Sequence, residues 1–217
     1  MTKKFNLCLF IVGCLFLIQA TSIEAQSKYP KTISVLQELY HCEMLDSLTY
    51  SAYAQKAIAE NYPHIAYLFI TLANSESIHA RNYKQILADL KVEVKEPPNP
   101  EIKVSTTKEN LKNGAQAELQ VIDQYPQFLE KIKPENYEAG IRYIMYAWEG
   151  DKQHRELIEK IRSGTGLFFG FLVKKIEKSP IRFFICQTCG FPTAEIPPIC
   201  PISKSPSSKY KEVVIIK

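Results

Sequence analysis

The sequence predicts a mainly α-helical protein, a four-helix bundle with one long crossover followed by a small cysteine-containing β domain. Apolar residues recur at helical spacing over four stretches of the chain. The proline-rich segment 91–105 separates the second stretch from the third, since it cannot continue a helix and is too long for a tight turn. Three cysteines between positions 186 and 200 then mark a separate small unit. A chain of 217 residues, 46% of them hydrophobic, is long enough for one core plus such an appendage.

The first residues have the layout of a secretory signal peptide. Lys3 and Lys4 precede an apolar run over residues 5–18, and small residues follow up to Ala25. The fourteen residues of this run (18 − 5 + 1) fall short of the roughly 20 that span a bilayer as a helix. We expect cleavage near Ala25, export to the periplasm or the exterior, and no membrane span afterwards. The alternative is lipid attachment at Cys14, because "IVGC" resembles a lipoprotein cleavage box.

Charge and cysteine content narrow the partners and the sulfur chemistry. The formal net charge is +4, and the sequence has no basic run with interleaved aromatic residues, so a nucleic acid is not an expected partner. In an oxidising compartment the cysteines that remain after signal cleavage could pair as disulfides, and this alternative stays open beside metal binding. These cysteines are Cys42, Cys186, Cys189 and Cys200.

Local signals set the helix boundaries. Pro63 suits the first turn of the second helix. Either Thr106 or Thr107 suits the N-cap of the third, ahead of Glu109. The expected helices run from 32 to about 60, from 63 to 90, from about 107 to 131, and from within 133–140 to about 162–166.

Each expected helix carries an acidic residue that can face the bundle interior. Two helices place an acid and a histidine three residues apart, on one helix face, and the other two carry single acids among apolar or small neighbours. A buried carboxylate is costly unless it is paired or bound to a metal. Four carboxylates and two imidazoles suit a pair of iron or manganese ions. The candidate ligands are Glu43, Glu76, His79, Glu118, Asp151 and His154.

A single acid–histidine pair usually lies on a solvated helix face. Two such pairs on the second and fourth helices, with single acids on the first and third, match the ligand arrangement of di-metal four-helix bundles. The pattern therefore favours a metal site.

Three helical strings and the cysteine segment resemble the rubrerythrin family. "YPHIAYLFITLANSESIHARNYKQIL" is similar to its second helix, "ENLKNGAQAELQVIDQYPQF" to its third, "GDKQHREL" to its fourth, and "CQTCGF" with "PPICPI" to its rubredoxin-like domain. The resemblance covers residues 36–214. It implies a ferritin-like bundle with a non-haem di-iron site, a homodimer, reduction of hydrogen peroxide, and electron transfer through a rubredoxin-type iron.

Four parts are therefore expected along the chain: a signal peptide over 1–25, a ferritin-like di-iron bundle over 26–163, an apolar connecting segment over 164–180 and a rubredoxin-like domain over 181–217. The aromatic residues of the connecting segment could pack on the bundle or form a dimer interface.

The resemblance also implies roles for individual residues. Asp151 stands where the family has a bridging glutamate, and the loss of one methylene draws its carboxylate back by about 1.5 Å, so bridging is expected to weaken. Val121 stands where the family usually has a further glutamate, which exchanges with the second-helix histidine as the iron changes oxidation state. His79 is therefore expected to remain a fixed ligand. The family's other ligand positions are matched by Glu43, Glu76, Glu118 and His154.

The C-terminal cysteines match three of the four ligand positions of a rubredoxin-like knuckle. They are Cys186, Cys189 and Cys200, and Ser203 takes the fourth position. A serine hydroxyl loses its proton far less readily than a thiol, so metal affinity is expected to fall and the reduction potential to shift. Three outcomes stay open: iron held by three sulfurs and Ser203 or water, zinc in a structural knuckle, or an empty, partly disulfide-bonded knuckle.

Three further residues lie near the expected site in the sequence. Tyr50 and Tyr125 are expected to line the bundle core near the metals in a structural role. Cys42 is expected to be a small buried hydrophobe and not a ligand.

The leading functional hypothesis is an exported, rubrerythrin-like di-iron oxidoreductase that reduces hydrogen peroxide or oxygen with electrons from a donor that the sequence does not name. One alternative is a metal-binding protein without turnover, motivated by Val121, Asp151 and Ser203. The other is a purely structural bundle with a vestigial knuckle.

Overall fold

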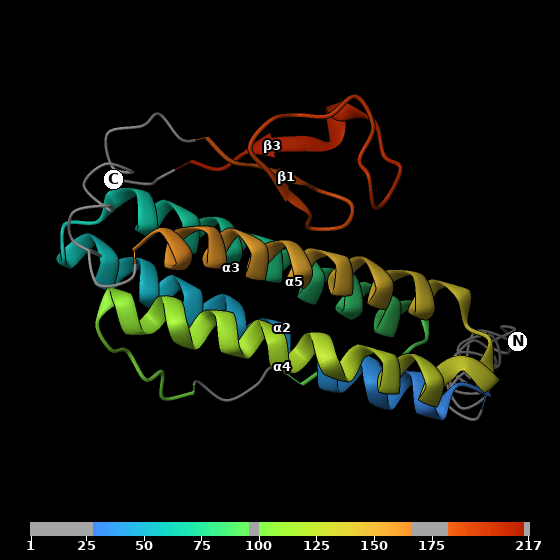
Figure 1. The fold of residues 1–217 in the computed structure, drawn as a ribbon. Helices are drawn as coiled ribbons and strands as arrows, with labels where there is room; N and C mark the ends of the chain where they lie inside the picture. The colour runs from blue at the N-terminus through green and yellow to red at the C-terminus, as the bar shows by residue number, and fades with distance from the viewer. Residues whose placement is uncertain (1–27, 96–99, 166–181, 215–217) are drawn as a thin grey trace, which may run out of the picture.

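The computed structural model describes residues 28–95, 100–165 and 182–214 (Figure 1). Its helices are α2 (Pro30–Ala59), α3 (Pro63–Asp89), α4 (Thr107–Ile132) and α5 (Glu138–Thr165), with a 3-10 turn η1 (Lys133–Glu135) between the last two. All four helices were expected, and each observed boundary lies within about two residues of its prediction. The predicted signal peptide and nearly all of the predicted apolar connecting segment lie outside the described residues.

The four helices form one elongated bundle (Figure 1). A three-residue turn over 60–62 joins α2 to the antiparallel α3. The chain then returns along the length of the bundle before α4 begins, so α3 and α4 run in the same direction (Figure 1). This confirms the predicted bundle with one long crossover.

Helix ends are stabilised partly across the bundle. Thr106 caps α4 through a capping box with Glu109. Of the two predicted N-cap residues, Thr106 and Thr107, the structure therefore uses the first. The first turn of α2 has no side-chain cap of its own. Instead the carboxylate of Glu135, just after α4, accepts hydrogen bonds of 2.8 Å from the backbone N–H groups of Lys31 and Thr32. A distant acid therefore satisfies donors that the helix geometry leaves unpaired.

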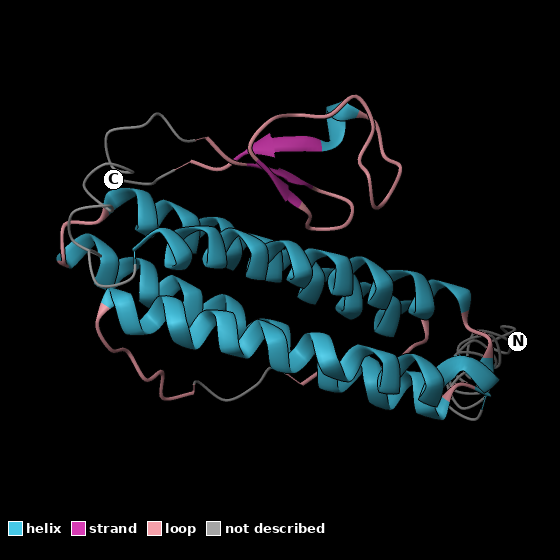
Figure 2. Cartoon of the chain, in the orientation of Figure 1, coloured by secondary structure: helices cyan, strands magenta, loops and turns pink. Residues whose placement is uncertain are grey.

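A small three-stranded antiparallel sheet follows the bundle (Figure 2). Its strands are β1 (Phe184–Cys186), β2 (Pro192–Thr193) and β3 (Tyr210–Glu212), in the order β2-β1-β3, with a 3-10 turn η2 (Ser207–Lys209) leading into β3. In the register of the sheet, Cys186 pairs with Tyr210 and Ile185 with Pro192. The sheet lies along the side of the bundle that α3 and α5 form (Figure 1).

The bundle core has two apolar clusters separated by a polar layer. One cluster contains Phe69, Leu72 and Leu111, and the other contains Leu36 and Tyr83. On α2, α4 and α5 the candidate metal ligands lie between residues of one cluster and residues of the other, and on α3 His79 lies at the boundary between them. Burial of apolar surface contributes about 25 cal/mol per Å². The two apolar clusters therefore offset the cost of burying the polar layer between them. Within the described ranges, no helix is both long and apolar enough to cross a membrane.

Candidate metal centre

All six candidate ligands from the bundle meet in its interior. They are Glu43, Glu76, His79, Glu118, Asp151 and His154, and none is more than 3% exposed. Their ligand atoms form two groups of four, each compact enough for one metal ion. Every helix contributes, because the acids and histidines on each helix are spaced to share its inner face. The reading of these pairs as solvated surface groups is therefore wrong.

The two groups are built alike around the shared residues Glu76 and Asp151. In the first, Nδ1 of His79 lies 2.9 Å from Glu76 Oε2, 3.4 Å from Glu43 Oε2 and 3.6 Å from Asp151 Oδ1. In the second, Nδ1 of His154 lies 2.9 Å from Glu76 Oε1, 3.4 Å from Glu118 Oε1 and 3.7 Å from Asp151 Oδ1. Each oxygen of Glu76 thus faces one imidazole, which is the geometry of a carboxylate bridge.

The outer nitrogens of the histidines fix which ring atoms face the carboxylates. Nε2 of His79 lies 3.1 Å from the carbonyl oxygen of Cys189, which can only accept, so Nε2 carries the proton. Nε2 of His154 lies 2.7 Å from Ser75 Oγ, and that hydroxyl donates to the carbonyl of Gly190, so this Nε2 also donates. In the neutral rings both Nδ1 lone pairs consequently point at carboxylate oxygens. A proton or a metal cation must stand between them.

The directions of the pKa shifts favour protons in this role when no metal is bound. Burial works to lower the pKa of His79, but Glu43 and Glu76 raise it to about 10. Burial raises the pKa of Glu43 to about 7, and burial together with Glu43 raises that of Asp151 well above its usual range. Two divalent ions, with a charge of +4, would balance the four carboxylates and leave both imidazoles neutral.

Two unpartnered atoms indicate that the residues fit a metal pair. Within the described residues, Asp151 Oδ1 and His154 Nδ1 are buried and have no partner in hydrogen-bonding geometry. Each is a candidate ligand atom, and unless a proton or a metal ion stands between it and a neighbouring atom, such a buried polar atom costs about 1–3 kcal/mol. Metal coordination would satisfy both at once.

Two buried tyrosines hold the carboxylates from outside the ligand set. Tyr50 donates to Glu118 Oε1 over 2.6 Å. Tyr125 donates to Asp151 Oδ2 over 2.7 Å and to Glu43 Oε1 over 3.2 Å. The prediction that both line the bundle core is confirmed, and both contact candidate ligands. Because Tyr125 engages Oδ2, it leaves Oδ1 of Asp151 turned toward both histidines.

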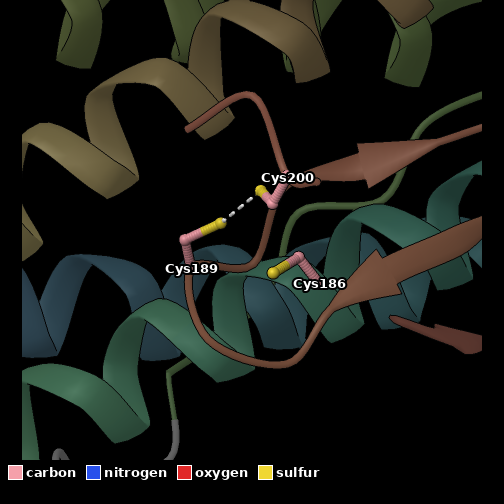
Figure 3. Close-up of side chains that lie close together, drawn as sticks. All are labelled: Cys186, Cys189 and Cys200. Atoms are coloured by element: carbon pink, nitrogen blue, oxygen red, sulfur yellow. Dashed lines mark hydrogen bonds between the residues drawn. The ribbon is translucent and has the colours of Figure 1, made fainter. Parts of the chain in front are cut away.

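The three cysteines of the small domain converge on a second candidate site (Figure 3). All three are buried, and none of them forms a disulfide bond in this structure. The sulfurs of Cys189 and Cys200 are 3.6 Å apart, and Sγ of Cys186 lies 3.5 Å from Oγ of Ser203. Hydrogen bonding with Cys189 lowers the pKa of the Cys186 thiol, which favours the thiolate that binds metals.

The cysteine site is held against the bundle by the backbone of its first turn. Four consecutive carbonyl groups, of residues 187–190, accept hydrogen bonds from side chains of α3. The donors are Arg81 to Gln187, Asn82 to Thr188, His79 to Cys189 and Ser75 to Gly190. The cysteine turn therefore contacts both bundle histidines. His79 donates to it directly, and His154 is connected to it through the hydroxyl of Ser75.

Comparison with known proteins decides the family. The rubrerythrin family model matches residues 34–162, more than half of the chain. The chain belongs to the rubrerythrin family. Among curated relatives, it is 28% identical to rubrerythrin-2 of Clostridium acetobutylicum over 82% of this chain and 95% of the relative. It is also 28% identical to a putative rubrerythrin of Methanocaldococcus jannaschii, over 84% and 92%.

Solved structures show the same fold. Nigerythrin in its fully reduced, all-ferrous state aligns with a TM-score of 0.72 at 23% identity, over 83% of this chain and 86% of that one. A bacterioferritin of Desulfovibrio desulfuricans aligns with a TM-score of 0.64 at 21% identity, over 69% and 89%. The ferritin-like bundle followed by a rubredoxin-like domain is therefore confirmed. Rubrerythrins are di-iron proteins, and the carboxylate–histidine cluster and the cysteine triad of this rubrerythrin suit such a site and a further metal.

Asp151 belongs to both ligand groups, and its Oδ1 lies 3.6 Å from Nδ1 of His79 and 3.7 Å from Nδ1 of His154. The weaker bridging expected of its shorter side chain stays a prediction. Val121, at the position where the sequence resemblance implies a further glutamate, is half-buried and packs on the apolar cluster around Tyr83 and Tyr125.

Some residues of this rubrerythrin differ from expectation or escaped it. Cys42 was expected to be buried and is exposed, because it lies one residue, or about 100° of helix rotation, from the inward-facing Glu43. Ser75 was missed, since its partners lie 79 and 115 residues away. Asp46 was missed too: burial, with Glu76 and Glu118, raises its pKa well above the usual range. Its position three residues after Glu43 was the available signal.

Proposed function

We propose that this rubrerythrin is an exported peroxide reductase that uses the six bundle residues as di-iron ligands. The observation that carries the proposal is the position of Glu76. Its Oε2 lies 2.9 Å from Nδ1 of His79, and its Oε1 lies 2.9 Å from Nδ1 of His154. A carboxylate placed in this way holds two ions side by side. Bound there, reduced iron supplies two electrons, one per metal, which together with two protons convert hydrogen peroxide to two waters.

The residues of the chain prepare that reaction. Glu76 and Asp151 are the proposed bridges, with His79 and Glu43 completing one ion and His154 and Glu118 the other. Tyr50 and Tyr125 donate to three of these carboxylates and so hold their orientation without occupying the centre. Because the ligands are at most 3% exposed, bulk water is kept from the reacting atoms.

The cysteine domain is the proposed entry point for electrons. Cys189 provides the sulfur on one side, and its own backbone carbonyl accepts a hydrogen bond from Nε2 of His79 on the other. The two candidate metal sites are thus connected within one chain by the covalent bonds of Cys189 and His79 and by the hydrogen bond between them. We expect a homodimer, and mixing experiments would then ask whether the connection also operates between chains.

The test is peroxide consumption by iron-loaded protein, reduced chemically without oxygen and followed by stopped flow. Wild type should consume about one peroxide per two irons in a rapid phase that Glu76→Ala with Asp151→Ala abolishes. Glu130→Ala with Glu156→Ala removes two exposed acids as a matched control and should react like wild type. Equal rates in wild type and the Glu76/Asp151 variant would refute the proposal.

A second candidate function is metal storage without turnover. Its support is Val121, since an apolar residue replaces the ligand that the family exchanges during redox cycling. Storage predicts tight iron binding and a single oxidation event. Repeated turnover with excess chemical reductant would exclude it and favour the reductase.

Export is the part of the proposal that rests on residues 1–25. The apolar run after Lys3 and Lys4 supports signal cleavage near Ala25, with lipid attachment at Cys14 as the alternative. Expression in a bacterial host with cell fractionation and N-terminal sequencing tests both. A new terminus near Gln26 in the periplasm or medium supports export, a lipid-modified Cys14 supports the alternative, and an intact terminus in the cytoplasm contradicts both.

A further inference from the structure

The turn that contains Ser203 repeats the turn that contains Cys189. In the first turn the N–H of Gly190 donates to the carbonyl of Cys186 over 2.8 Å, and in the second the N–H of Lys204 donates to the carbonyl of Cys200 over 3.1 Å. Gly190 has φ +81° and Lys204 has φ +58°, so a left-handed residue closes each turn. Cys186 and Cys200 also donate their own N–H groups to the carbonyls of Phe191 and Ser205, in each case five residues on. Ser203 therefore occupies the backbone position of a fourth cysteine.

The distances around Ser203 match a tetrahedral ion with one oxygen ligand. Metal–sulfur bonds of about 2.3 Å place neighbouring sulfurs about 3.8 Å apart, and a metal–oxygen bond of about 2.0 Å places that oxygen about 3.5 Å from each sulfur. The observed separations are 3.6 Å between Cys189 Sγ and Cys200 Sγ and 3.5 Å between Cys186 Sγ and Ser203 Oγ. The serine oxygen thus lies at a ligand's distance from the sulfur of Cys186.

Neighbouring polar groups hold the Ser203 side chain in place. The hydroxyl of Ser203 donates to Ser205 Oγ over 3.1 Å, and that hydroxyl donates to Thr188 Oγ1 over 2.9 Å. The backbone N–H of Ser205 donates to Ser203 Oγ over 3.4 Å, as an N–H group does toward a metal-bound anion. Both neighbouring hydroxyls belong to half-buried residues, so a proton released from Ser203 can reach solvent along them.

We propose that Ser203 is the fourth ligand of the cysteine site, which is therefore a closed site of three thiolates and one oxygen. On metal binding Ser203 gives up its hydroxyl proton to solvent and its oxygen binds the ion. The domain is a substituted metal site and not a remnant of one. This inference concerns the small domain alone, so it stands or falls independently of peroxide reduction.

Cobalt(II) added to the metal-free purified chain tests the assignment without any turnover. The near-ultraviolet charge-transfer band between thiolate and cobalt reports only cysteine-bound metal, so cobalt in the bundle, held by oxygen and nitrogen, does not contribute. Affinity follows from competition with a chelator in wild type, Ser203→Ala and Ser203→Cys. Ser207→Ala, an exposed serine of the same domain, is the matched control.

A closed site and an open site respond differently to added imidazole. We expect the wild-type spectrum to ignore imidazole, whereas Ser203→Ala binds cobalt at least tenfold more weakly and changes its spectrum when imidazole takes the vacated position. Ser203→Cys should bind more tightly than wild type, and Ser207→Ala should match wild type. An imidazole response in wild type itself, or equal cobalt affinity in wild type and Ser203→Ala, would overturn the proposal. The wild-type measurement holds even where a variant does not fold.

Discussion

Nε2 of His79 donates to the backbone carbonyl of Cys189 over 3.1 Å, and so a histidine of the bundle and a cysteine of the small domain share one hydrogen bond. Two neighbouring donors on α3, Arg81 and Asn82, engage the carbonyls of Gln187 and Thr188. Arg81 and Asn82 belong to neither ligand set, so they hold the cysteine turn without taking part in metal binding.

Asn82→Ala should therefore loosen the small domain and leave the bundle site intact. A neutral hydrogen bond contributes about 0.5–1.5 kcal/mol, so amide hydrogen exchange over residues 186–191 should accelerate about two- to tenfold. Mass spectrometry of exchanged peptides measures this effect. Gln85→Ala, which removes only an exposed contact to Asp89 on the same helix, serves as the control. Unchanged exchange in Asn82→Ala would show that the contact does not restrain the turn.

Gly150→Ala should weaken the metal group of His79. A Cβ at position 150 would lie 2.7 Å from Cε1 of His79, too close for any real contact, so the imidazole must move. Alanine is ordinarily better than glycine in a helix by about 1 kcal/mol, which makes a loss here diagnostic. We expect iron affinity to fall about tenfold or more by chelator competition.

Gly140→Ala is the matched variant on the same helix. Its Cβ would meet the methyl Cγ2 of Thr32 at 3.0 Å, far from the metal ligands. It should alter the free energy of unfolding only and leave iron affinity at the wild-type value. Equal iron affinity in both variants would show that the absence of a side chain at Gly150 is not needed to position His79.

Tyr125→Phe should destabilise the protein more than Tyr50→Phe. Tyr125 donates to Asp151 and to Glu43, whereas Tyr50 donates only to Glu118. Hydrogen bonds to charged groups contribute about 1.5–3 kcal/mol, and the lost donor leaves buried oxygens unpaired. Urea unfolding of the iron-loaded variants measures the difference. The opposite ranking would mean that relaxation around Asp151 compensates for the missing hydroxyl.

Glu135→Gln should lower stability at neutral pH and have little effect in acid. Burial opposes ionisation, but the hydrogen bonds from Thr32 and Lys31 together outweigh it and lower the pKa of Glu135 below its unfolded value of 4.5. The stabilisation is therefore complete above that value and is lost as pH falls through the lower folded pKa. By analogy with helix caps, we expect a cost of about 1 kcal/mol at pH 7.

The pH series gives this prediction its control. Unfolding free energies of wild type and Glu135→Gln should converge as the pH falls from 4.5 through the lower folded pKa, where the carboxylate of the wild type gains its proton. A difference that stays constant over this range would assign the effect to packing and not to charge.

Much of this architecture was predictable because its signals are local. Pro63 begins a helix, Thr106 with Glu109 caps one, and the acid–histidine spacing of three residues needs only helix geometry. The convergence of the six candidate ligands could be predicted from the sequence because burial makes an unpaired acid improbable in an apolar stripe.

The rest depended on contacts between distant segments. Ser75 has no local pattern, since it matters only because Gly190 comes to rest against it. The exposure of Cys42 depended on the rotation of its helix, because neighbouring residues point about 100° apart and can lie on opposite sides of the boundary between core and surface. The match between the two cysteine turns needed backbone angles, because a sequence shows Lys204 but not its left-handed conformation.

The Cys189–Gly190 turn also has a consequence for how the protein is assembled. It lies against His79 and Ser75 while every candidate bundle ligand is at most 3% exposed, so the docked turn covers this face of the candidate centre. A metal ion entering by this face would require the turn to lift first. The docking contacts would then slow both the entry and the loss of metal along this route.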